Sequence, residues 1–142
     1  MPISVDEKAA ALASLPLFQG ASDESLARLC NVTGEVEYSA GQFVVRQGQV
    51  GSGLYLIVSG AARVVSGSHE LATLGPGDFF GELTVIDQQP RTASVQATQD
   101  TVCLAVASWD LLDLLKSDSA LALNLIRGLA ARVRSNAEHH RH

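Results

Sequence analysis

The feature of this sequence that most limits its fold is a change of periodicity near Thr33. From there to Ala107, apolar residues alternate or cluster at the two-residue period of β-strands, and turn residues separate the runs about every ten residues. Glycine, proline, serine and aspartate mark these turns, as in Gly75-Pro76-Gly77-Asp78. The expected strands are Val36–Tyr38, Phe43–Val45, Leu54–Val58, Ala61–Val65, Leu71–Leu74, Ala93–Ala97 and Val102–Val106. Many short strands at this spacing predict a mostly β fold, an antiparallel sandwich or jelly-roll barrel.

Helical patterns flank these strands on both sides. Ser4 and Glu7 form a capping-box pattern before an apolar stretch that Pro16 ends, and Ser22 is placed to cap a second short helix. After the strands, one helix is expected to begin at Ser108. The sequence therefore predicts helices at both ends of the β region.

The last helix is the longest of those expected. Asp118 or Ser119 caps it, and it runs to about Asn136. Two apolar stripes follow its length: Leu121, Leu125 and Leu129, and then Ala122, Ile126, Ala130 and Val133. One stripe can cover the β region, and the other leaves a face for a dimer seam or a ligand lid.

The length of 142 residues suits one domain with its own core. We expect a single domain over 1–142, with N-terminal helices at 1–32, strands at 33–107, C-terminal helices at 108–136 and a basic tail at 137–142. Residues 79–95 form a distinct segment of the β region, and a short helix expected after Glu82 interrupts the series of strands there.

Charge and cysteine content exclude several classes of protein. A formal net charge of −5 argues against a nucleic-acid-binding body. Two cysteines are too few for a disulfide framework or a four-cysteine zinc site, and Cys103 is expected in the core. No leader or membrane span is evident, so we expect a cytoplasmic protein.

Basic residues gather at the C-terminal end. The last sixteen positions hold four of the ten basic residues and three of the four histidines. Two interpretations stay open: a solvated helix end, where cations suit the helix dipole, or a surface for a partner.

The stretch from Gly81 to Val95, GELTVIDQQPRTASV, indicates an anion site with an unusual carboxylate. The short helical segment begins with exposed N–H groups, and Arg91 adds a permanent cation whose planar fork suits phosphate. Glu82 only accepts hydrogen bonds, so a sugar hydroxyl is its natural donor. Together these groups suggest a ribose phosphate. Each residue considered alone also has a simpler interpretation: Glu82 as an acid at a helix N-terminus, and Arg91 as a surface residue that follows Pro90.

Three longer motifs resemble the cyclic-nucleotide-binding domain, the family of the bacterial catabolite activator, the cyclic-nucleotide-dependent kinases and the nucleotide-gated channels. LPLFQGASDESLARL resembles its N-terminal helical segment, and AGQFVVRQGQVGSGLYLIVSGAARV its glycine-punctuated strands. GPGDFFGELTVIDQQPRTASV resembles its phosphate-binding cassette, with an arginine nine residues after the glutamate of FGE. Gly53 departs from the family, which more often has a polar or acidic residue there.

The resemblance implies a role for each site residue. Glu82 would accept the ribose 2′-hydroxyl, Arg91 would hold the phosphate, and Gly81 would let the backbone approach the sugar. Backbone N–H groups around the cassette would complete the cradle, and Leu71 would contact the base or the core. The expected ligand-binding residues are Gly81, Glu82, Leu83, Thr84, Arg91, Thr92, Ala93 and Leu71. Thr92 is compatible with cyclic AMP and with cyclic GMP.

The resemblance also implies a regulatory function. We expect a sensor of cyclic AMP or cyclic GMP that signals by moving its C-terminal helix, without a cofactor or metal and without enzymatic activity. Its expected partner is a second copy, bound through that helix, or an effector protein. Family activators continue into a helix-turn-helix domain and this sequence stops at His142, so no DNA binding is expected. The alternative is a ligand-independent interaction module or a fragment of a transcription regulator.

Overall fold

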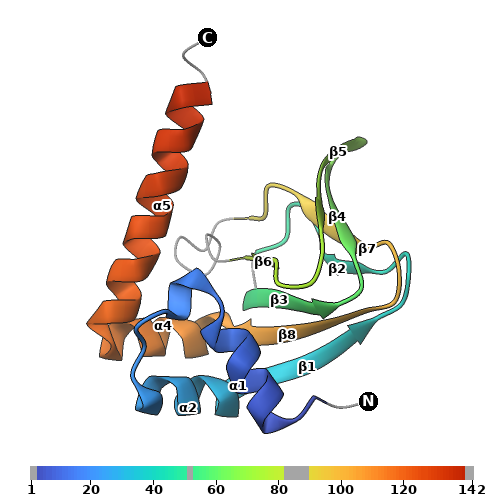
Figure 1. Cartoon of the computed structure of the whole chain (residues 1–142). Helices are drawn as coiled ribbons and strands as arrows, with labels where there is room; N and C mark the ends of the chain where they lie inside the picture. The colour runs from blue at the N-terminus through green and yellow to red at the C-terminus, as the bar shows by residue number, and fades with distance from the viewer. Residues whose placement is uncertain (1–2, 51–52, 82–89, 140–142) are drawn as a thin grey trace.

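The computed structural model describes residues 3–50, 53–81 and 90–139. Helices open the chain, two β-sheets follow, and helices close it (Figure 1). The expected cassette helix and the site residues Glu82, Leu83 and Thr84 lie outside the described residues.

The N-terminal helices begin where the sequence places their caps. They are α1 (Val5–Ala13), the 3-10 helix η1 (Pro16–Phe18) and α2 (Asp23–Val32). The Ser4 hydroxyl accepts the Glu7 N–H at 3.1 Å, and the Ser22 hydroxyl accepts the Ser25 N–H at 3.1 Å. Both predicted caps are confirmed.

Eight strands form two four-stranded sheets, and every pairing is antiparallel. The first sheet has the order β1 (Thr33–Tyr38), β8 (Thr101–Ala107), β3 (Gly53–Ser59), β6 (Phe79–Phe80). The second has the order β2 (Phe43–Val45), β7 (Ser94–Ala97), β4 (Ala62–Ser66), β5 (His69–Leu74).

The mostly antiparallel β fold with helical flanks is confirmed, but the barrel is not closed. A closed barrel requires the edge strands of a sheet to pair with each other. In the described residues, β1 and β6 stay edges of one sheet, and β2 and β5 stay edges of the other. The two sheets therefore pack as separate layers. β6 was not predicted, because a strand of two residues shows no alternation.

Two apolar clusters hold the layers together. One lies between the helices and the first sheet and includes Phe18, Leu29, Leu54 and Leu104. The other includes Ile57 and lies between the two sheets. Because β3 contributes to both clusters, it is buried on both faces and reads as a nearly continuous apolar run.

Cys103 is fully buried in the second cluster, as the sequence predicts. Burial in this apolar surrounding disfavours the thiolate and raises the pKa of Cys103 to about 11. The thiol is therefore an inert core group.

Two helices follow the strands: α4 (Ser108–Ser117) and α5 (Ser119–His139). The Asp118 carboxylate accepts the N–H groups of Ala120 and Leu121, so Asp118 caps α5. Figure 1 shows α5 packed beside η1 at its start and projecting past the sheets at its end. None of the helices in the described ranges has the length and apolar content to cross a membrane.

Candidate functional site

Arg91 occupies a fixed, buried position at the entrance to β7. Its side chain is only 7% exposed. Its backbone N–H donates to the Gln49 carbonyl at 2.7 Å, and its own carbonyl accepts the Gly48 N–H at 2.8 Å. These bonds tie Arg91 to the turn after β2, while Val50 and Pro90 form a β-bridge beside it. The sequence alternative of a surface arginine is therefore wrong.

The Arg91 guanidinium lies against the start of β3 and the end of β6. Its Nη2 donates to the Gly53 carbonyl at 3.1 Å. Its Cζ lies 5.9 Å from the Tyr55 ring centre, within the range of a cation–π contact. Tyr55 in turn stacks on Phe80, with ring centres 5.2 Å apart. Sequence reasoning did not assign the Gly53 carbonyl or Phe80 to the site, and a backbone carbonyl leaves no sequence signal.

Gly81 brings the chain close to this guanidinium. Its φ of +103° lies in the region that favours glycine. A Cβ on Gly81 would lie 2.3 Å from the Gly53 carbonyl oxygen and 3.3 Å from Arg91 Nη1. Gly81 therefore lies close beside the Arg91 guanidinium, with little room between them for a side chain.

Gly53, which departs from the family pattern, has a packing reason. A Cβ at this position would lie 2.1 Å from the Val106 carbonyl oxygen on β8. Gly53 is the first residue of β3 and is buried. Glycine is needed here because two backbones approach closely, and the same residue supplies the carbonyl that Arg91 binds.

The other predicted ligand-binding residues that the structure describes are Thr92, Ala93 and Leu71. Thr92 is exposed and Ala93 is half-buried, and both directly follow Arg91. Leu71 is 60% exposed on the edge strand β5, so the alternative that it packs in the core is wrong. The described residues thus bring Gly81 and Arg91 together and leave Leu71 on an outer strand.

A polar hollow of about 490 Å³ lies apart from Arg91 and is lined by acidic side chains. Glu37 and Asp100 line it together with Tyr38 and Thr101. Carboxylates repel a phosphate, so this hollow does not suit an anionic ligand. No group of metal-ligating side chains occurs in the described part of the chain.

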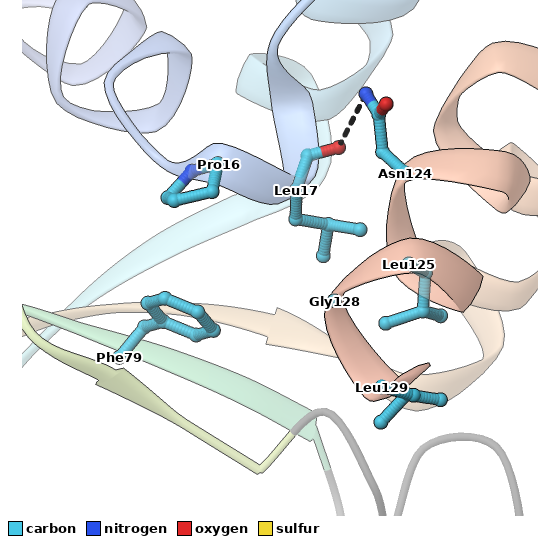
Figure 2. Close-up of a pocket in the computed structure, with 7 residues that line it drawn as sticks. All are labelled: Pro16, Leu17, Phe79, Asn124, Leu125, Gly128 and Leu129. Atoms are coloured by element: carbon cyan, nitrogen blue, oxygen red, sulfur yellow. Dashed lines mark hydrogen bonds between the residues drawn. The ribbon is translucent and has the colours of Figure 1, made fainter. Parts of the chain in front are cut away.

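A smaller cavity of about 210 Å³ lies between α5, η1 and β6. Figure 2 shows Leu17 of η1 above it, Phe79 of β6 on one side, and Leu125 and Leu129 of α5 on the other. At its rim, the Asn124 side chain donates to the Leu17 carbonyl at 3.5 Å and to the Gln19 carbonyl. The base of α5 is thus held by a polar anchor beside incomplete apolar packing.

Comparisons with known proteins agree with this fold. The profile described as "Cyclic nucleotide-binding domain" matches residues 35–118. The cyclic AMP receptor protein of Thermus thermophilus is 37% identical over 124 residues, which cover 84% of this chain and 57% of that protein. The cGMP-dependent protein kinase of Toxoplasma gondii is 33% identical over 102 residues, covering 72% of this chain and 10% of that protein.

The structural comparison points the same way. The crystal structure of the Thermus thermophilus catabolite activator protein superposes with a TM-score of 0.78 at 35% identity. The match covers 88% of this chain and 61% of that one. This chain therefore spans little more than half of these bacterial relatives and a small part of the kinase.

The fold consists of two antiparallel sheets with helical flanks, and it holds a buried arginine, Arg91, beside Gly81. The chain belongs to the cyclic nucleotide-binding domain family. The family's relatives include receptor, kinase and kinase-regulatory proteins.

Proposed function

We propose that this chain binds a cyclic mononucleotide, cyclic AMP or cyclic GMP, with Arg91 holding the phosphate. The observation that carries the proposal is the buried Arg91 guanidinium beside Gly81, inside the range that matches the family. A planar, permanently charged fork matches phosphate oxygens in geometry and in charge. Glu82 accepts the ribose hydroxyl, and N–H groups around Leu83, Thr84, Thr92 and Ala93 complete the cradle.

The base of the nucleotide contacts groups outside the cassette in this proposal. We assign Leu71 to the contact with the base, because its apolar side chain is 60% exposed and is available to a ligand or partner. One relative is named for cyclic AMP and another for cyclic GMP, and the proposal takes both as candidate ligands.

Signalling in this proposal passes through α5. The helix is anchored by Asn124 at its base, and the cavity of about 210 Å³ beneath it leaves room for a second packing. Nucleotide binding can shift the equilibrium between two positions of α5 only as far as the nucleotide binds one of these states more tightly than the other. The output is a regulatory contact, to a second copy or to an effector, and not a chemical reaction.

Replacement of Arg91 tests the nucleotide site directly. We expect Arg91→Ala to weaken cyclic nucleotide binding by about 30- to 1000-fold, because the phosphate loses its main counter-charge. Arg91→Lys keeps the positive charge but loses the planar fork of donors, so its affinity for the nucleotide should lie between those of the wild type and Arg91→Ala. Isothermal titration calorimetry with cyclic AMP and with cyclic GMP measures these affinities.

Arg63→Ala is the matched control. Arg63 is an exposed arginine of β4 whose side chain donates to Gln96 Oε1 at 2.9 and 2.7 Å. This variant should bind like the wild type. Because Arg91 also bonds the Gly53 carbonyl, circular dichroism must show that Arg91→Ala is folded at the titration temperature. Equal affinities of Arg91→Ala and wild type would contradict the role of Arg91.

A ligand-independent interaction module is the second candidate function. The exposed apolar side chains of α5, among them Ile126 at 61% and Val133 at 68%, favour it. Wild-type protein that binds neither nucleotide, and yet binds a partner through α5, would establish this function in place of the first.

A further inference from the structure

The cavity of about 210 Å³ between α5, η1 and β6 has an apolar lining (Figure 2). Leu17 lines it from η1, Phe79 from β6, and Leu125 and Leu129 from α5. Of the described lining residues, Asn124 alone has a hydrogen-bonding side chain, and its amide nitrogen already donates to the Leu17 carbonyl. None of the described lining side chains is ionisable. The lining therefore suits a neutral, apolar occupant better than it suits an ion or water.

Gly128 keeps this space open. It lies in the interior of α5, where glycine is the least favourable residue for a helix apart from proline. Close packing does not require the glycine, because a Cβ at this position would meet nothing within 4 Å. A side chain here would begin in the cavity that Gly128 lines. The chain thus has its weakest helix former at the point where a larger residue would fill the cavity.

The size and openness of the cavity fit a small aromatic molecule. An engineered cavity of about 150 Å³ with an apolar lining binds benzene, so a cavity of about 210 Å³ admits a somewhat larger molecule, such as two fused rings. Phe79 favours an aromatic partner, because rings attract each other in offset-stacked and edge-to-face arrangements. Pro16 and Gly128 are both exposed, so the cavity is open to solvent beside them.

The cavity lies apart from the proposed nucleotide site. The two residues of β6 point to opposite faces, as successive residues of a strand do. Phe79 packs against the apolar cluster beside the helices, whereas Phe80 packs against the cluster between the sheets and stacks on Tyr55. A molecule in the cavity therefore lies on the helical side of β6. The Tyr55 and Phe80 rings, near Arg91, lie on the other side.

We propose that the cavity between α5, η1 and β6 is a second ligand site, which binds a small neutral aromatic molecule of one or two rings. The molecule contacts all three elements at once, so it holds the base of α5 against η1 and β6. This inference goes beyond the proposed function and does not depend on nucleotide binding.

Indole, a neutral molecule of two fused rings, is the probe for this site. Isothermal titration calorimetry of the whole chain with indole should give a dissociation constant of about 1 mM or below, as expected for a small apolar ligand. Gly128→Leu should weaken binding at least about tenfold, because its side chain occupies the cavity. Gly128→Ala fills less of the space and should weaken binding by a smaller factor. Both substitutions favour the helix, so both variants should stay folded.

Ala120→Leu is the matched control. It also adds a leucine side chain to α5, at an exposed position that does not line the cavity, and should bind indole like the wild type. Circular dichroism checks that each variant is folded at the titration temperature. Amide chemical shifts locate the probe: the signals of Leu17, Phe79 and Leu129 should move more than that of Arg63 on β4.

Three results would overturn the proposal. The first is wild-type protein that binds no indole up to the solubility limit of the probe. The second is equal affinity of Gly128→Leu and wild type, which would place indole elsewhere on the surface. The third is loss of indole binding in Arg91→Ala, which would place indole in the nucleotide site. Unchanged indole affinity in a protein that binds no nucleotide would leave this proposal standing and contradict only the proposed function.

Discussion

At the scale of single residues, the candidate site is built as much by backbone as by side chains. The types and spacing of Gly81, Glu82 and Arg91 predict a phosphate site with a hydroxyl acceptor; the structure places Gly81 beside Arg91, and Glu82 lies outside the described residues. The carbonyl of Gly53 that receives Arg91 could not, because every residue has a carbonyl and only the approach of β3 to β8 places this one. Leu71 could be placed on a strand, but its exposure depends on β5 being an edge.

Gly81→Ala should damage both stability and nucleotide binding. The substitution is strained by the φ of +103°, and the new Cβ would meet the Gly53 carbonyl oxygen at 2.3 Å. Gly67→Ala is the matched control, with a φ of +61° and nothing within 4 Å of its Cβ. The strained backbone costs both variants about 1–2 kcal/mol. We expect Gly81→Ala to lose at least about 1 kcal/mol more, because only it has the clash.

Urea unfolding followed by the fluorescence of Trp109, the single tryptophan, measures this difference. Nucleotide affinity should fall in Gly81→Ala, because the added methyl group also presses on Arg91, and should be unchanged in Gly67→Ala. Equal losses of stability in the two variants would show that the close contact with Gly53 has no energetic weight.

At the scale of elements, the helix caps were the most predictable features and the shortest strand the least. Ser4, Ser22 and Asp118 start helices because their side chains accept N–H groups that have no partner within the helix. β6 has only two residues, and its pairing with β3 depends on contacts distant in the sequence. The sheet order likewise depends on long-range pairing, so strand positions predict a β fold without deciding whether a barrel closes.

A partly buried hydrogen bond joins two of these elements at the base of α5. The Ser25 hydroxyl on α2 donates to Asp118 Oδ2 at 2.6 Å, and Asp118 also caps α5. The Ser25 bond, followed by the N–H groups of the cap, lowers the pKa of the Asp118 carboxyl below its ordinary value of 3.8, although partial desolvation opposes this. The junction therefore depends on the ionised form of Asp118.

Ser25→Ala should lower the melting temperature at neutral pH and lose this effect in acid. A carboxyl whose folded pKa is lowered contributes stability above its unfolded pKa, and the contribution disappears as the pH falls through the folded pKa. The difference between wild type and variant should therefore shrink below pH 3.8. Thermal unfolding followed by circular dichroism at several pH values measures it.

Ser14→Ala provides the comparison for this pH dependence. Ser14 is exposed, and its hydroxyl donates to the Ala11 carbonyl without an ionisable partner. Its effect on the melting temperature should be small and the same at each pH. A Ser25→Ala effect that is constant with pH would show that Asp118 does not respond to the Ser25 bond.

At the scale of the whole molecule, the chain has a compact acidic part and a projecting basic helix (Figure 1). The sequence predicts both the charge division and the spare face of α5, because both follow from residue order. It does not predict where α5 points. That direction is set by the hydrogen bonds from Asn124 of α5 to the Leu17 and Gln19 carbonyls, which join residues more than a hundred positions apart, and by the packing around the 210 Å³ cavity.

The most direct measurement of the central claim is the thermal stability of the wild-type protein at increasing concentrations of cyclic AMP and of cyclic GMP. A ligand that binds only the folded state stabilises it by about 2.7 kcal/mol at a hundred times its dissociation constant. We expect a melting temperature that rises steadily with at least one of the two nucleotides. A melting temperature that stays constant with both, up to millimolar concentrations, would contradict the assignment of this chain as a cyclic nucleotide sensor.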